Sequence, residues 1–187
     1  KKKNIIYGFD KILIEKKSKK KIIKDKKMLL VSIGGTDKFD LTKRLPNILN
    51  DEEFRDFKFL WVKGPFVKKP LFKKSVINFK CIGNRLSLNK LYKKSSFAIV
   101  LFGVSFFETV YYGIPQIVHF PKEKKEKKGL IEILRKRNFL VSQNLIELKK
   151  NLKILFKNKK KLKKIAKKNS KLLNFRNRKK ILNNFIK

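Results

Sequence analysis

Short apolar runs that stop at glycine or proline recur along the middle of the chain. The first covers residues 28–33 and stops at Gly34 and Gly35. Runs without polar alternation are typical of strands buried on both faces of a parallel sheet. Five more runs follow at residues 57–62, 76–82, 97–102, 116–120 and 139–142. The pattern therefore predicts six strands.

Segments with helical spacing of apolar residues separate these runs. They cover residues 40–49, 87–94, 105–112 and 129–136, and Gly113 is expected to end the third in a left-handed conformation. From residue 145 the chain is predicted to be helical to its end, with apolar stripes at residues 152–166 and 181–186. Strands that alternate with helices imply right-handed crossovers, so the expected fold class is α/β with a doubly wound parallel sheet and C-terminal helices.

The domain organisation follows from composition. Lysine dominates residues 1–26, which we interpret as a basic linker or edge segment that enters the domain, and residues 27–187 form one core-bearing domain with a helical extension. The longest apolar run, residues 97–104, is far shorter than the ~20 residues of a membrane-spanning helix. The basic start does not have the pattern of a signal peptide. We expect a cytoplasmic protein, either free or peripheral at the inner face of the membrane.

The charge of the chain has two interpretations. Its 52 Lys and Arg against 14 Asp and Glu give a net charge of +38, and clustered cations bind polyanions by releasing counterions. Yet lysine far outnumbers arginine, and Lys, Asn, Ile and Phe, which all have A/T-rich codons, are abundant together. The lysines are then either a solvated surface, or they contact an anionic membrane or a nucleic acid without sequence specificity.

Cysteine and histidine each occur once, as Cys81 and His119. This excludes an internal disulfide and a metal site of the usual Cys/His kind, so we expect no metal and a reducing compartment. His119 lies inside an apolar run and is interpreted as a core or strand-end histidine rather than a general base.

Two glycine turns are the candidate ligand-binding sites. Ligands of open α/β sheets bind beyond the carboxyl ends of the strands, where the N-termini of helices favour anions. A Gly-Gly pair allows a ligand to approach the backbone, although it can equally be only a turn. The candidate residues are Gly34, Gly35 and Thr36 after the first run, and Gly103, Val104 and Ser105 after the fourth.

Glu108 is a carboxylate in an otherwise apolar segment. Ser105 and Glu108 have the Ser-x-x-Glu spacing of a helix capping box. In the other interpretation Glu108 lies in the first helical turn and accepts hydrogen bonds from both hydroxyls of a ribose, because a carboxylate has two acceptor oxygens. The residues alone leave both interpretations open.

Together, the stretches LLVSIGGTD and CIGNRLSLNKLYKKSSFAIVLFGVSFFETVYYGIPQIV resemble the C-terminal, nucleotide-sugar-binding domain of the GT-B superfamily. The likeness extends to the peptidoglycan N-acetylglucosaminyltransferase, and more closely to the UDP-sugar hydrolase of pseudaminic acid biosynthesis and its spore-coat polysaccharide relatives. It spans residues 28–142 and implies a Rossmann-like fold. These proteins share a Gly-Gly-Ser/Thr turn, a later glycine turn, and a helix whose Glu precedes Gly-[Ile/Val/Leu]-Pro.

The resemblance implies roles for individual residues. The turn at residues 34–36 matches the family's turn on the diphosphate side of the donor site. The turn at residues 103–105 matches the turn that lies over the phosphates. Ile82, after the third strand, matches the position whose backbone reads uracil, and Glu108 matches the ribose ligand. In the segment expected to face the donor sugar, Glu126 matches a hydrogen-bond acceptor for that sugar. Neither a metal nor a cofactor is required, and no catalytic group is expected in this chain.

The departures from the family concern Phe102, which replaces a small residue at the phosphate turn, and the lysine-rich segment 122–128, which replaces a polar one. The resemblance also implies that the catalytic base lies on an N-terminal Rossmann-like half, to which residues 7–17 resemble the connection. We expect the UDP-sugar-binding half of a glycosyltransferase or UDP-sugar hydrolase of surface polysaccharide or nonulosonic acid biosynthesis. The alternatives are a noncatalytic polyanion-binding module and a degenerate assembly domain.

Overall fold

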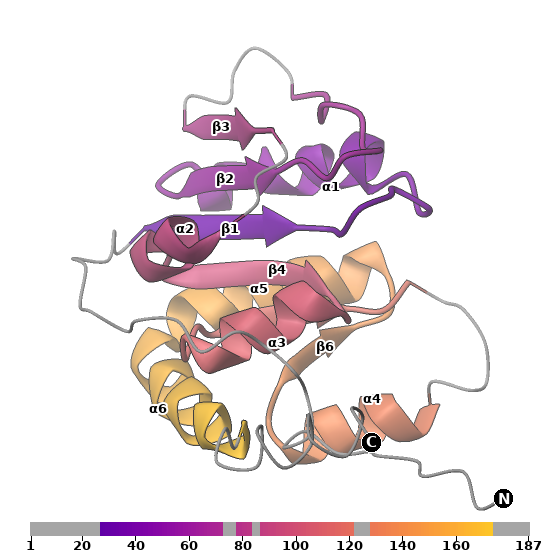
Figure 1. Cartoon of the computed structure of the whole chain (residues 1–187). Coiled ribbons are helices and arrows are strands. Elements are labelled where there is room, and N and C mark those ends of the chain that lie inside the picture. The colour runs from indigo at the N-terminus through magenta and orange to yellow at the C-terminus, as the bar shows by residue number, and fades with distance from the viewer. Residues whose placement is uncertain (1–26, 73–77, 84–86, 122–127, 174–187) are drawn as a thin grey trace, which may run out of the picture.

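The computed structural model describes residues 27–72, 78–83, 87–121 and 128–173. These residues form a six-stranded parallel sheet in the order β3-β2-β1-β4-β5-β6 (Figure 1). The strands are β1 (Met28–Ser32), β2 (Lys58–Val62), β3 (Phe79–Ile82), β4 (Phe97–Leu101), β5 (Gln116–His119) and β6 (Leu140–Ser142). Each lies within one of the predicted apolar runs, so the predicted α/β fold with a Rossmann-like parallel sheet is confirmed.

Helices cover both faces of the sheet (Figure 1). One layer contains α1 (Leu41–Leu49), the 3-10 helix η2 (Glu52–Phe54) and α5 (Leu145–Lys157). The opposite layer contains α2 (Asn89–Lys94), α3 (Val104–Tyr111) and α4 (Lys128–Lys136). Helix α6 (Lys159–Asn169) follows α5 and leads into η4 (Ser170–Leu172). The four predicted helices before residue 145 and the first part of the C-terminal helical region are therefore present.

The two cores explain why the strands are apolar without alternation. In β1, Leu29 and Val31 are buried against the α1 and α5 layer, whereas Leu30 is buried in the α3 layer. Successive side chains of a strand point to opposite faces, so a strand covered on both sides needs apolar residues at every position. In α5 and α6, four members of the first predicted apolar stripe are buried, namely Leu152, Leu155, Leu162 and Ala166.

The connections after β1 and β4 turn to opposite faces of the sheet. The chain passes from β1 to α1 in one layer and from β4 to α3 in the other, although β1 and β4 are hydrogen-bonded neighbours. This is a topological switch point, and it opens a crevice between the carboxyl ends of the two strands. The fold thereby places the two predicted glycine turns side by side.

Details of the helices agree with the local sequence signals. Gly113 follows α3 with a φ of +60°, as expected for a left-handed helix stop.

The basic segment 1–26, the second apolar stripe at residues 181–186 and Glu126 lie outside the described residues. Within the described ranges, none of the helices has the length and apolar character needed to cross a membrane.

Candidate functional site

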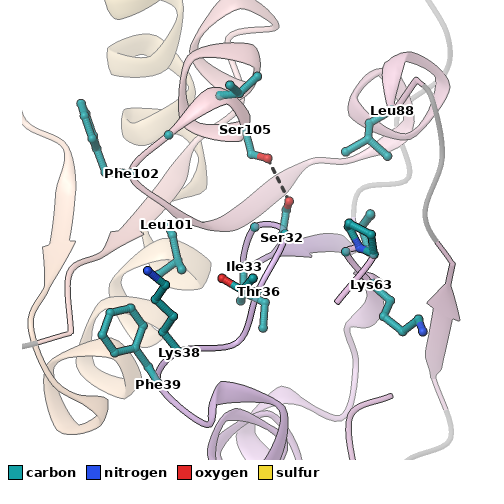
Figure 2. A pocket seen from close by; sticks show the side chains of 17 residues that line it. Ser32, Ile33, Thr36, Lys38, Phe39, Lys63, Leu88, Leu101, Phe102 and Ser105 are labelled. Atoms are coloured by element: carbon teal, nitrogen blue, oxygen red, sulfur yellow. Dashed lines mark hydrogen bonds between the residues drawn. The ribbon is translucent and has the colours of Figure 1, made fainter. Parts of the chain in front are cut away.

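A cavity of about 450 Å³ opens at the carboxyl ends of β1, β2 and β4 (Figure 2). Its volume lies in the range of small-molecule binding sites. The lining consists of residues 32–36, 38, 39, 62–65, 88 and 101–105. The cavity therefore occupies the switch point of the sheet, where open α/β folds bind ligands.

The two predicted turns meet at this cavity. Gly34, Gly35 and Thr36 line it from the end of β1, and residues 103–105 line it from the end of β4 and the start of α3. The Ser32 and Ser105 hydroxyls lie 3.0 Å apart and share a hydrogen bond in which either can donate (Figure 2). This bond joins β1 to α3 across the crevice and holds the two turns at a defined separation.

The Gly34–Gly35 turn rests on the loop after β2. Gly34 has a φ of +90°, a conformation that favours glycine. At Gly64 an added Cβ would lie 2.8 Å from the Cα of Gly35 and closer still to the carbonyl oxygen of Gly34. The amide of Phe66 also donates to the Gly35 carbonyl at 3.1 Å. Gly64 thus lines the cavity in close contact with the Gly34–Gly35 turn, whereas in the sequence it is only a glycine that follows the apolar run at residues 57–62.

The N-termini of α1 and α3 differ in their capping. The Asp37 carboxylate accepts the amides of Leu41 and Thr42, both at 2.8 Å, and the Thr42 hydroxyl at 2.6 Å. The first turn of α1 is therefore satisfied internally. Helix α3 begins at Val104 with no side-chain cap. Because uncapped first-turn amides attract anions, the start of α3 is better suited to receive an anion than the start of α1.

The predicted capping box does not form. Ser105 is the second residue of α3 rather than its cap, and Gly103 occupies the capping position. Glu108 consequently lies in the second turn of the helix, not in the first as expected. One of its carboxylate oxygens accepts a hydrogen bond from the Tyr92 hydroxyl at 2.7 Å. Glu108 is half-buried and is not part of the cavity lining.

Tyr92 fixes the orientation of Glu108. Its side chain belongs to α2 and is 1% exposed. Burial, followed by the negative charge of Glu108, raises the pKa of Tyr92 far above its ordinary value. The phenol therefore remains protonated and donates to the carboxylate. The sequence offered no signal for this pair, because Tyr92 looks like any other apolar position of a helix.

Ile82 and Glu126 lie elsewhere. Ile82 is the last residue of β3 rather than the residue after it, and it is not part of the cavity lining. Its carbonyl oxygen accepts the Lys63 amide at 2.8 Å. Glu126 lies outside the described residues.

Phe102, the bulky residue in the turn after β4, lines the cavity, but its ring packs against other aromatic side chains. Its ring centroid lies 5.0 Å from that of Phe106, 5.4 Å from that of Phe107 and 5.6 Å from that of Phe120. Figure 2 shows the ring at the edge of the site. The ring is therefore held in an aromatic cluster on the α3 side.

Two lysines of the lining were missed at the level of sequence. Lys38 follows the Gly34–Thr36 turn, and Lys63 follows β2 (Figure 2). In a chain with 52 Lys and Arg, nothing local distinguishes these two from solvated lysines. Figure 2 shows the Lys38 side chain directed toward Leu101 and the site, whereas the Lys63 side chain extends outward from the end of β2. The cavity thus has a cationic side chain on the β1 side, in addition to the helix N-terminus on the β4 side.

His119 is a core residue, as predicted. It is 3% exposed, and its Nδ1 lies 2.9 Å from the Ser142 hydroxyl. Burial lowers its pKa from 6.5 to about 4, so it is neutral at physiological pH. It is not part of the cavity lining. Among the described residues, no group of three or more His, Cys, Asp or Glu side chains is arranged to hold a metal ion.

The fold is similar to part of several solved glycosyltransferases. The chain matches a UDP-glucosyltransferase from Polygonum tinctorium with a TM-score of 0.59 and 13% identity, over 89% of this chain and 42% of that one. It matches the glycosyltransferase SnogD from Streptomyces nogalater with a TM-score of 0.56 and 14% identity, over 81% and 38%. For the spinosyn forosaminyltransferase SpnP the TM-score is 0.57 at 13% identity, over 89% and 45%.

These likenesses concern the fold. The chain spans less than half the length of each of these structures. No protein-family model matches the sequence, and no curated protein sequence matches it significantly. The resemblance to the GT-B fold is confirmed as an architecture, and what this chain binds has to be argued from its own cavity.

Proposed function

We propose that this domain binds the nucleoside diphosphate of a sugar donor and forms the donor-binding half of a GT-B-type glycosyltransferase or UDP-sugar hydrolase. The observation that carries the proposal is the convergence of two glycine turns and the uncapped start of α3 on one cavity at the switch point. Backbone amides at such a position bind phosphate oxygens without requiring a metal.

The diphosphate is expected at the α3 side of the cavity. The Asp37 carboxylate occupies the first-turn amides of α1 and would repel an anion there. The start of α3 carries no such group, and Gly103 adds no side chain in front of it. Lys38 and Lys63 line the same cavity and would balance part of the negative charge.

The nucleoside is expected to extend from the cavity toward α2. Leu88, just before α2, lines the cavity, and Tyr92 of α2 reaches Glu108 on α3. A ribose on this side would meet the carboxylate oxygen of Glu108 that Tyr92 does not engage. The backbone at Ile82 would face the uracil, and Glu126 would approach the sugar.

Catalysis would need a second half. When the glycosidic C–O bond to the diphosphate breaks, the amides and lysines of this domain would stabilise the leaving oxygen. The base that deprotonates the acceptor hydroxyl or water would come from an N-terminal Rossmann-like domain or subunit that closes over the cavity. We place such an enzyme in the cytoplasm and in surface polysaccharide or nonulosonic acid biosynthesis.

Replacement of Gly103 by leucine tests the diphosphate site. A Cβ at Gly103 meets no atom within 4 Å, so the side chain should extend into the cavity without disturbing the fold. Isothermal titration with UDP and UDP-N-acetylglucosamine should show binding to the wild type and a loss of at least about tenfold in Gly103→Leu, equivalent to ~1.4 kcal/mol.

The matched control is Gly129→Leu on α4, where an added Cβ also meets no atom within 4 Å and which lies outside the cavity. Its affinity should equal that of the wild type. Equal affinity of Gly103→Leu and the wild type would contradict the proposed site. A folded wild type that binds neither nucleotide would favour the degenerate assembly domain.

A further inference from the structure

Helix α6 lies near the amino ends of β5 and β6, at the opposite end of the strands from the candidate site (Figure 1). Its residues Leu162 and Ala166 border a small cavity together with Gln116 and Leu140, the first residues of β5 and β6. The side-chain amide of Asn169 donates to the Arg137 carbonyl at 3.1 Å. The helix is therefore anchored across the amino ends of these strands, whereas the cavity of the candidate site opens at the carboxyl ends.

The outer face of α6 carries only positive charge. Seven of its eleven residues are lysine, and the helix contains no acidic residue. In fact no Asp or Glu occurs anywhere from Leu148 onward. Lys160, Lys164 and Lys167 are exposed and lie on one stripe, because residues four and seven apart share a face of a helix. No α6 lysine forms an ion pair within the described residues.

The neighbouring helix α5 shows that such compensation is available in this protein. Lys149 of α5 pairs with Asp51, and Lys153 pairs with Glu53 at 2.6 Å. These pairs neutralise part of the charge of α5. On α6 seven lysines lie on one short helix, and among the described residues none of them has an acidic ion-pair partner of the kind that Asp51 and Glu53 provide for α5.

We propose that the outer face of α6 is a contact surface for an anionic lipid bilayer. A dense row of lysines is attracted to anionic headgroups without any specific contact. The large exposed hydrophobic residues among the described ones lie on other elements, so α6 would rest on the surface rather than insert into it. The helix has no arginine or aromatic residue, the side chains that read bases or stack on them, which favours lipid over nucleic acid.

This placement leaves the candidate site free. A five-residue strand such as β1 spans about 16 Å, so the cavity lies at least that far from the amino edge. The Debye length at physiological ionic strength is about 8 Å, and the lipid field therefore fades before it reaches the cavity. A domain held through α6 would present its cavity away from the bilayer. The inference is independent of the proposed function.

Vesicle co-sedimentation tests the surface. Vesicles of phosphatidylcholine and phosphatidylglycerol at 4:1, and of phosphatidylcholine alone, would be mixed with the wild-type chain at 150 mM salt. The test variant changes Lys160, Lys164, Lys167 and Lys168 to glutamine, which preserves helix propensity. We expect binding to the anionic vesicles only, with a loss of roughly tenfold or more in this variant.

The control variant removes the same four charges elsewhere, with Lys43, Lys68, Lys80 and Lys90 changed to glutamine. These lysines are exposed on α1, the loop after β2, β3 and α2, and the variant should bind within about twofold of the wild type. Equal losses in both variants would overturn the proposal in favour of net charge alone. It would also fail if the wild type ignored the vesicles, or if the α6 variant lost affinity for a 20-base-pair DNA duplex but not for vesicles.

Discussion

The buried phenol of Tyr92 decides how Glu108 can act. Glu108 has no capping role at the start of α3, so the hydrogen bond from Tyr92 is what orients its carboxylate. The 2.7 Å bond from Tyr92 holds one carboxylate oxygen and leaves the other for a ligand. If Glu108 reads the ribose, Tyr92 is its positioning residue.

Removal of the Tyr92 hydroxyl should affect ligands that carry a complete ribose diol. In Tyr92→Phe we expect UDP to bind about three- to tenfold more weakly, an effect of the size of one hydrogen bond, whereas 2′-deoxy-UDP should change little. Titration of wild type and variant with both nucleotides measures this difference. Equal losses for the two ligands would contradict the positioning role, because Tyr92 would then affect binding without regard to the ribose diol.

At the scale of elements, the N-termini of α1 and α3 differ in their capping at the switch point. Helix α1 has its first-turn amides bonded to Asp37, and helix α3 leaves its own uncapped beside Gly103. Gly64 brings the end of β2 against the Gly34–Gly35 turn, and the Ser32 to Ser105 bond joins the ends of β1 and α3. The geometry of the cavity is thus a property of three strand ends together.

Loss of the Asp37 cap should destabilise the domain. Asp37→Ala removes three hydrogen bonds at the start of α1, and we expect unfolding to require about 1–2 kcal/mol less free energy. Urea unfolding followed by circular dichroism provides the measurement. Asp37→Asn, which keeps an acceptor oxygen, should recover part of the loss. A stability unchanged in Asp37→Ala would show that the cap contributes nothing.

At the scale of the whole molecule, one apolar core lies on each face of the sheet. Several polar side chains are buried with these cores. His119 is one such group, at the end of β5. Its folded-state pKa of about 4 lies below the ordinary value of 6.5. The unfolded chain therefore binds a proton more readily than the folded one between these values, and the stability from neutral His119 is lost as pH falls through that window.

Stability should accordingly depend on pH above the range of the carboxylates. Between pH 7 and pH 5 we expect the free energy of unfolding of the wild type to fall by about 2 kcal/mol. Urea unfolding at several pH values in this interval measures the slope. In His119→Gln, which does not titrate, the slope should disappear. A wild-type stability that stays flat from pH 7 to pH 5 would rule out a neutral His119 as the cause.

The amino-acid sequence by itself determined the strands, most helix positions and the two glycine turns, because apolar periodicity and glycine act over a few residues. The tertiary structure decided which of these meet. It placed β4 beside β1, capped α1 with Asp37, held Glu108 with Tyr92 and selected Lys38 and Lys63 among many lysines. Most of these outcomes depend on contacts between residues far apart in the chain, where steric fit and burial leave no local mark on the sequence.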